Sequence, residues 1–370
     1  MPWDGRTVKE CRFEFVELAG KEGVNFRQLC ERFGVSRKTG YKWAGRQDLE
    51  NRSRRPNTSP NRTAPEIEAL VLELAGKKPS WGARKLRSRL IHQGFHGIPA
   101  VSTVVQILRR NGIERLTQAP AGPWQRFEHS EPNELWQMDF KGHFAIDGAR
   151  CHPLTVLDDC SRYSLCVEAC HNQKTQTVKE RLTRVFERYG LPWAILCDNG
   201  SPWGSETEHR LNPLSVWLMK LGVEVWHGRP YHPQTQGKLE RFHRTLKLEA
   251  LQGNVLRTLL DCQQTFDQFR HQYNHERPHQ ALDMQTPANR YHPSARSFPN
   301  KLSEPEYGHE WSVRKVTHPG LISYKGQELD VPQALIGEHV GIQHLSDHLI
   351  EVRYFARIVS NIDLRDYANV

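Results

Sequence analysis

The sequence has 370 residues, with 51 Lys and Arg against 42 Asp and Glu and a formal net charge of +9. It has no apolar run near the roughly 18 residues that cross a bilayer, and its first residues lack the apolar core of a signal peptide, which argues against a membrane or secreted protein. Its eight cysteines form no Cys-x-x-Cys pair and no zinc-ligand pattern, so we expect reduced core thiols in a cytosolic protein.

The positive charge lies at the front of the chain. Residues 1–130 hold 24 basic and 13 acidic side chains, whereas residues 131–370 hold 27 and 29. This uneven distribution indicates a polyanion-binding region ahead of a different activity. The length allows roughly two to four domains.

Residues 7–45 are predicted to form three short helices. The stretch "NFRQLCERFGVSRKTGYKW" predicts a helix that ends at Phe33, a left-handed C-cap at Gly34, and Ser36 as the N-cap of a basic helix. A helix, a tight turn and a basic second helix are typical of a helix-turn-helix unit, although any three-helix bundle shares that pattern. The residues expected to face DNA are Arg37, Lys38 and Lys42.

A linker rich in Asn, Ser, Pro and Arg follows, and a second helical unit comes after it. In the linker, Arg52, Arg54 and Arg55 are candidates for phosphate contacts, the alternative being a plain soluble tether. In the second unit, Ser102 is expected to cap a helix, "TVVQILRRNG", that presents polar side chains. Two such units in tandem favour DNA recognition. The candidate contacts of the second unit are Gln106, Arg109 and Arg110.

From Glu134 the hydrophobic period changes to two. The stretches "ELWQMDFKGHF", "CHPLTVLDD" and "SRYSLCVEAC" predict three consecutive strands, and a helix over 174–189, a strand "WAILCD", a helix near 213–221, a strand "VEVWH" and a further helix follow. This order predicts an α/β domain with a mixed sheet. Beyond residue 308, five short strand-like stretches predict a small β-barrel.

The last helix of the α/β domain carries one acid among bases. Leu239, Phe242 and Leu246 form its expected buried stripe, which starts near Gly237. Glu240 shares a second stripe with three basic side chains. A carboxylate in that position suits a metal beside a nucleic-acid backbone. The basic residues expected to hold phosphate here are Arg244, Lys247 and Lys238.

Two further acids qualify as partners of Glu240. Asp139 lies inside an apolar strand, where a carboxylate costs desolvation energy unless a cation balances it. Asp198 ends the strand "WAILCD", at the edge where α/β sites form, although such an acid can also be a turn residue. Phosphodiester chemistry is served by two divalent cations roughly 3.5–4 Å apart. Carboxylate oxygens suit Mg²⁺ or Mn²⁺, so the acids predict two such ions in one active site.

At these residues the sequence resembles a known family. "WQMDF", "CDNG" and "HPQTQGKLERFHRTLK", in this order, are similar to the retroviral-integrase-type core of insertion-sequence transposases, the DDE recombinases. The likeness runs from Asn133 to Tyr291 and includes "YNHERPHQALDMQTP". It implies a ribonuclease H-like fold with Asp139, Asp198 and Glu240 as catalytic, metal-binding triad.

The sequence departs from the family in two places. Asp198 and Glu240 are separated by 41 residues, more than is usual, and the excess falls in "SPWGSETEHRLNP". The His-His-Cys-Cys zinc module of retroviral integrases is absent from the sequence, and helix-turn-helix units stand in its place.

The resemblance implies a DNA transposase. It would bind the terminal inverted repeats of its element, cleave at the 3′ end and join that end to target DNA. We expect it to act as a homo-oligomer, at least a dimer, or a tetramer. Its expected location is the prokaryotic cytoplasm at the nucleoid, without a membrane partner. The alternatives are a catalytically inactive or domesticated DNA-binding regulator and, third, a metal-dependent nuclease. The expected parts are helix-turn-helix domains at 1–50 and 65–117, a catalytic domain at 133–292, a barrel at 310–370, and linkers at 51–64, 118–132 and 293–309.

Overall fold

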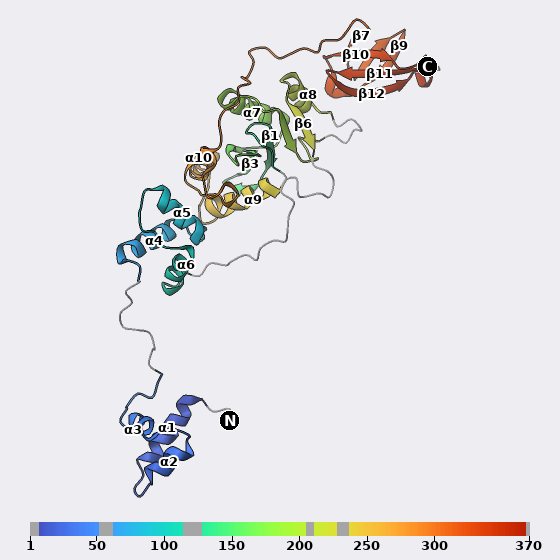
Figure 1. The fold of residues 1–370 in the computed structure, drawn as a ribbon. Coiled ribbons are helices and arrows are strands. Elements are labelled where there is room, and N and C mark those ends of the chain that lie inside the picture. The colour runs from blue at the N-terminus through green and yellow to red at the C-terminus, as the bar shows by residue number, and fades with distance from the viewer. Residues whose placement is uncertain (1–6, 52–61, 114–127, 205–210, 228–236, 368–370) are drawn as a thin grey trace. The chain divides into compact units, whose positions relative to one another are not determined.

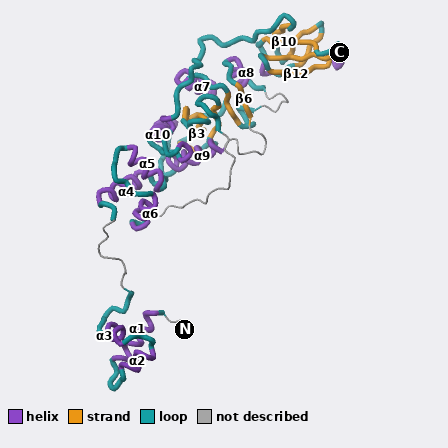
Figure 2. The backbone as a smooth tube through the Cα atoms, in the orientation of Figure 1, coloured by secondary structure: helices purple, strands orange, loops and turns teal. Residues whose placement is uncertain are grey.

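The computed structural model describes residues 7–51, 62–113, 128–204, 211–227 and 237–367. The chain separates into two compact units, Met1–Thr63 and Ala64–Val370. Figure 1 traces the order of the elements along the chain, and Figure 2 distinguishes helices, strands and loops. No helix in the described ranges is long and apolar enough to span a membrane. All eight cysteines are unpaired thiols, as expected.

The first unit is a bundle of α1 (Val8–Ala19), α2 (Phe26–Arg32) and α3 (Arg37–Ala44). Phe15 is fully buried at its centre, with the rings of Phe26, Phe33 and Trp43 packed edge-on around it. The predicted turn is confirmed. Gly34 has a φ of +64°, and the Ser36 hydroxyl accepts a 3.2 Å hydrogen bond from the Thr39 amide at the start of α3.

The second unit begins with another three-helix module of α4 (Pro65–Lys77), α5 (Ala83–His92) and α6 (Val101–Arg110). The expected cap at Ser102 is wrong. Ala100 takes the extended N-cap backbone, with φ −57° and ψ 155°, so α6 begins at Val101 and Ser102 lies inside its first turn. The buried core of this module includes Val71, Trp81, Leu86, Val104 and Ile107.

The α4–α6 module contacts the helices that follow in the chain. Glu276 lies 3.5 Å from Arg89 and 4.0 Å from Lys78, and the Ser80 hydroxyl donates to Glu249 over 2.7 Å. These polar contacts join the module to the end of α10 (Leu259–His275) and to the π-helical turn Lys247–Leu251.

A mixed sheet follows, as predicted. Strand β1 (Leu135–Phe140) lies between antiparallel β3 (Ala149–Asp158) and parallel β5 (Ala194–Cys197), with β4 (Ser164–Cys170) beyond β3 and β6 (Glu224–His227) beyond β5. The expectation of one strand over "ELWQMDFKGHF" is wrong. Gly142, at a φ of +81°, breaks it, and a separate strand β2 (Phe144–Ile146) pairs with the start of β3.

Helices cover both faces of this sheet (Figure 1). One face packs against α7 (Thr175–Tyr189) and α8 (Pro213–Lys220), and the other against α9 (Gly237–Leu246) and α10. The predicted stripe of α9 is confirmed, because Leu239, Phe242 and Leu246 are all buried against the sheet. Short 3₁₀ helices lie at Gln280–Leu282, Pro287–Asn289, Gln333–Leu335 and Leu364–Tyr367.

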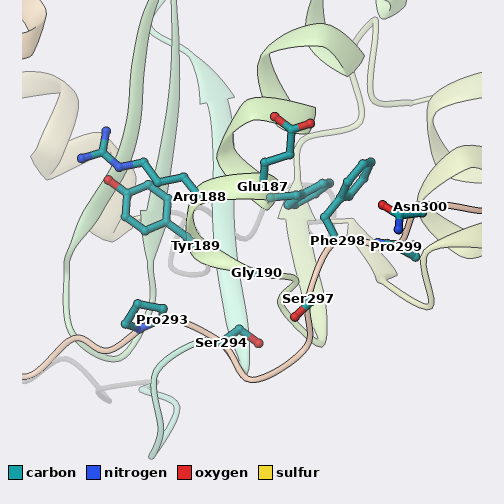
Figure 3. Close-up of a pocket in the computed structure, with 11 residues that line it drawn as sticks. Glu187, Arg188, Tyr189, Gly190, Pro293, Ser294, Ser297, Phe298, Pro299 and Asn300 are labelled. Carbon is teal, nitrogen blue, oxygen red and sulfur yellow. The ribbon is translucent and has the colours of Figure 1, made fainter.

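Residues 293–309 carry no helix or strand, and their first part is strapped to the α/β domain. The Arg296 guanidinium donates to the carbonyl oxygens of Pro192, Leu221 and Gly222 at 2.5, 3.1 and 2.7 Å. Gly190 has a φ of +78° where the strap passes, and a Cβ there would lie 2.7 Å from the Ser294 carbonyl oxygen. A cavity of about 540 Å³ lies between this strap and the end of α7. Figure 3 draws the residues that line it.

The C-terminal strands form a four-stranded antiparallel sheet, ordered β12-β11-β10-β7, and a separate β8-β9 hairpin. The predicted closed barrel is not confirmed, since no pairing among the described strands joins the hairpin to the sheet. Sequence also missed one strand: Lys325 and Gly326, with φ of +48° and +80°, turn the chain back into β9. These strands are β7 (Ser312–Lys315), β8 (Leu321–Tyr324), β9 (Gln327–Asp330), β10 (His339–His344), β11 (Leu349–Tyr354) and β12 (Arg357–Asp363).

Candidate active site

Strand pairing brings Asp139 and Asp198 together. Strands β1 and β5 run parallel, with Gln137 opposite Leu196. Continuing that register by two residues places Asp139 beside Asp198 at the carboxyl ends of the strands, where neighbouring strands are about 4.8 Å apart. Each carboxylate is oriented locally, because Asp139 accepts from the Phe140 amide at 2.7 Å and Asp198 from the Gly200 amide at 2.9 Å.

The electrostatics of the pair favour a bound cation. Burial and, next in size, the neighbouring Asp198 carboxylate together raise the pKa of Asp139 to about 7, against a smaller lowering by the Phe140 amide and Lys141. Two carboxylates in this arrangement repel each other unless positive charge lies between them. Their oxygens are the donors that Mg²⁺ and Mn²⁺ prefer.

Helix α9 is fixed to the same strand by a hydrogen-bonded bridge. The Thr155 hydroxyl, on β3 opposite Asp139, donates to the Asp139 carbonyl oxygen at 2.8 Å and lies 2.7 Å from His243 Nε2. Because the hydroxyl proton is used on the carbonyl, His243 must donate from Nε2. Burial, with Lys141 nearby, lowers the pKa of His243 to about 4, which agrees with a neutral ring.

Glu240 lies one helical turn before His243, and its side chain is exposed. Over the described ranges no group of three His, Cys, Asp or Glu side chains is close enough to hold one metal ion. The structure therefore pairs Asp139 with Asp198 and carries Glu240 on the adjacent helix without closing all three into one cluster.

The long segment after Asp198 is anchored beside the pair. Trp203 is 2 % exposed and stacks on Phe140, the residue after Asp139, with ring centroids 5.4 Å apart. The Asn212 side-chain amide (Nδ2) donates to the Trp203 carbonyl oxygen at 2.5 Å, where the chain enters α8. The described part of this insertion thus packs on the end of β1.

Family models match most of the chain from residue 37 onward. Two models described as "Integrase core domain" match residues 129–233 and 221–287, and one described as "Homeodomain-like domain" matches 37–108. A model described as "IS481 family transposase, C-terminal domain" matches residues 311–369.

Similar proteins agree with the family models. The transposase for transposon Tn552 of Staphylococcus aureus is 27 % identical over 352 residues, covering 82 % of this chain and 71 % of that protein. The transposase InsD for insertion element IS2D of Escherichia coli is 26 % identical, covering 59 % and 75 %. The chain is an insertion-sequence transposase. A 31.7 kDa protein of insertion element IS407 from Burkholderia multivorans is 24 % identical to the transposase, covering 72 % and 91 %.

Solved structures similar to the transposase include a simian T-cell lymphotropic virus intasome, with 16 % identity and a TM-score of 0.38 over 79 % of this chain and 99 % of that one. The HTLV-2 integrase catalytic core in complex with magnesium is 15 % identical, with a TM-score of 0.35 over 44 % and 99 %.

The expected DNA contacts of the transposase fall into three groups. Most are exposed: Arg37, Lys38, Lys42, Gln106, Arg109, Arg244 and Lys247. Arg52, Arg54 and Arg55 lie outside the described residues. Two are engaged within the protein: Arg110 pairs with Glu68, and the Lys238 ammonium lies 2.5 Å from Asp159. Lys238 therefore points into the transposase core, contrary to our expectation.

Sequence reasoning overlooked the turn between β3 and β4 of the transposase. Asp158 is fully buried and accepts from the amides of Asn133 and Ser161, both at 2.7 Å, so it builds the turn. Asp159 is also fully buried and reaches α9. The signal in the sequence was the pair of adjacent acids at the end of an apolar strand. Burying two carboxylates costs free energy unless hydrogen bonds or cations compensate them, so both are expected to have structural partners.

Proposed function

We propose that this transposase cleaves DNA at the 3′ ends of its element and joins the freed hydroxyls to target DNA, with Asp139, Asp198 and Glu240 as its metal-binding catalytic acids. The observation that carries this proposal is the parallel register that sets Asp139 beside Asp198, with α9 tied to the same strand through Thr155 and His243. Glu240, on α9, is the third acid that we propose for the site at the carboxyl ends of β1 and β5.

The donor set fits divalent cations. The pair at the sheet edge gives carboxylate oxygens that each accept a backbone amide, and hard ions are bound by such oxygens. We propose two Mg²⁺ or Mn²⁺ ions, which Asp139, Asp198 and Glu240 would hold. When bound, such ions activate the attacking oxygen and stabilise the leaving oxygen in an in-line displacement.

The remaining residues position the DNA. Arg244 and Lys247 are exposed on the side of Glu240, so they are proposed to hold phosphates next to the scissile bond. Residues 1–50 and 65–117 are proposed to bind adjacent segments of one terminal inverted repeat, residues 133–292 to perform the chemistry, and residues 310–370 to form a separate domain. Strand transfer joins two ends, so we propose a synaptic homo-oligomer of two or four protomers acting in a bacterial cytoplasm.

The proposal is tested by replacing Asp139 or Asp198 with Asn, or Glu240 with Gln. Joining of an end-sequence DNA in Mg²⁺ should fall by more than about 10³-fold, because each change removes a metal ligand, while binding of that DNA stays near the wild-type level. Any one variant that joins at a near-normal rate removes its residue from the triad. Wild-type protein that binds the end without cutting it favours the regulator, and cutting without joining favours the nuclease.

The bipartite contact with the element end is tested by footprinting the full chain. Replacing Arg37, Lys38 and Lys42 together by Ala should erase protection over one segment of the end, and replacing Gln106 and Arg109 should erase it over the adjacent segment. If both sets of changes erase the same segment, the two modules do not divide the end between them.

A further inference from the structure

Asp159 lies at a junction of three segments around the active site. Its carboxylate accepts from the Gln137 side-chain amide at 2.7 Å and from the His129 backbone amide at 2.9 Å, and it pairs with the Lys238 ammonium at 2.5 Å. Asp159 is fully buried, and the Lys238 side chain is 16 % exposed. A buried ion pair of this kind is costly to break from one side.

Two partners of Asp159, Gln137 and Lys238, each lie two residues before one of the proposed catalytic acids. Gln137 precedes Asp139 by two residues on β1, so both side chains point to the same face of the sheet. Lys238 precedes Glu240 by two residues in the first turn of α9. One carboxylate thus joins the strand of the first acid to the helix of the third.

A second link completes the attachment of α9 to the sheet. Thr155 and Asp159 lie four residues apart along β3 and its end, on the face that α9 covers. Thr155 contacts His243 at 2.7 Å, and Asp159 contacts Lys238. With both ends held, the helix cannot rotate or slide without breaking one of these contacts.

Local helix energetics do not account for a lysine at this place. A positive charge in the first turn of a helix is opposed by the positive end of the helix dipole. The Lys238 ammonium also gives up most of its contact with water. Its burial against Asp159 is therefore a tertiary contact that sets where α9 begins.

We propose, resting on the function proposed above, that Asp159 and Lys238 are positioning residues that set the placement of Glu240 against Asp139 and thereby the affinity of the metal site. Neither residue touches DNA or metal. Their loss leaves all three acids present but places Glu240 wrongly.

The test compares Lys238→Met and Asp159→Asn with two controls in the full chain. Lys238→Arg keeps the charge. Lys220→Met removes an equally buried lysine, 12 % exposed and 3.0 Å from Glu338, at the far end of α8. Two quantities are measured: the Mn²⁺ concentration for half-maximal joining of a pre-nicked end, and the Mn²⁺ concentration for half of the metal-induced rise in Tm without DNA.

Lys238→Met and Asp159→Asn should raise both Mn²⁺ concentrations about 10- to 100-fold, as loss of a residue behind a metal ligand does. The double variant should be no worse than either single one, because both remove the same contact. Lys238→Arg should stay within about threefold of wild type, and Lys220→Met should lower Tm while leaving both Mn²⁺ concentrations unchanged.

Two outcomes overturn the proposal. In one, Lys238→Met needs no more Mn²⁺ than Lys220→Met at a matched loss of Tm. In the other, the log–log salt dependence of DNA binding flattens by about 0.9 in Lys238→Met, which makes Lys238 a phosphate contact. Wild-type protein that neither joins ends nor gains Tm from Mn²⁺ would instead count against the proposed function itself.

Discussion

Replacing Asp139 by Asn should stabilise the metal-free protein at alkaline pH, although we expect the same change to abolish joining. Burial and Asp198 raise the pKa of Asp139 from 3.8 to about 7 in the folded protein. A folded-state pKa above the unfolded value means that the folded state holds its proton more tightly. The stability from Asp139 is therefore fully present below pH 3.8 and is lost as the pH rises through about 7.

The size of this effect follows from the difference between the two pKa values. At about 1.36 kcal/mol per pKa unit, it is about 4 kcal/mol at most, and partial exposure of the side chain reduces it to roughly 1–2 kcal/mol. In chelator, the free energy of unfolding of Asp139→Asn should exceed that of wild type at pH 8, and the gap should narrow as the pH falls towards 5.

The assay is urea unfolding at pH 5 to 8 in EDTA, with Asp147→Asn as the control. Asp147 is an exposed acid in the turn between β2 and β3 of the same domain, so its replacement should leave a gap that is flat with pH. The reasoning would be refuted if the difference in unfolding free energy between Asp139→Asn and wild type did not change with pH, or if it favoured wild type increasingly towards pH 8. Either result would mean that burial and Asp198 do not raise the pKa of Asp139.

Three further outcomes are expected. Neutralising Arg244 and Lys247 together should flatten the log–log salt dependence of pre-nicked end binding by roughly 0.9 per lost contact while Mn²⁺-induced stabilisation survives, and identical slopes would make them solvated bystanders. Trp203→Ala should lower the free energy of unfolding by about 3–5 kcal/mol by leaving a cavity against Phe140, and a change near zero would show that the insertion does not anchor there. Thr155→Val should lower the free energy of unfolding by about 1–3 kcal/mol and slow joining, because His243 loses its buried hydrogen-bond partner. Unchanged unfolding and joining would show that the Thr155–His243 hydrogen bond does not hold α9 in place.

Local signals in the sequence predicted what depends on neighbours in the chain. The stripe of Leu239, Phe242 and Leu246 follows from the helical period, and the turn at Gly34 and Ser36 follows from backbone preferences and capping. The three acids could be singled out because carboxylates in apolar or basic surroundings need a reason to be there. The resemblance then gave them roles.

What the sequence could not supply depends on contacts between distant segments. Asp139 lies beside Asp198 because β1 pairs with β5, although β2, β3, β4 and α7 come between them in the chain. The hydrophobic period of a strand does not indicate which other strand it pairs with. The partner of Lys238 lies 79 residues away, so a lysine that reads as a phosphate contact is in fact buried. Barrel closure likewise depends on pairings that five short strand signals leave open.

The chain enters and leaves the α/β domain at a single corner. Glu128, where the described domain begins, lies 3.0 Å from Arg290, near its end, and 3.1 Å from Arg162 in the turn that carries Asp159. The described start of the domain is therefore tied both to its end and to the turn whose Asp159 holds the first turn of α9.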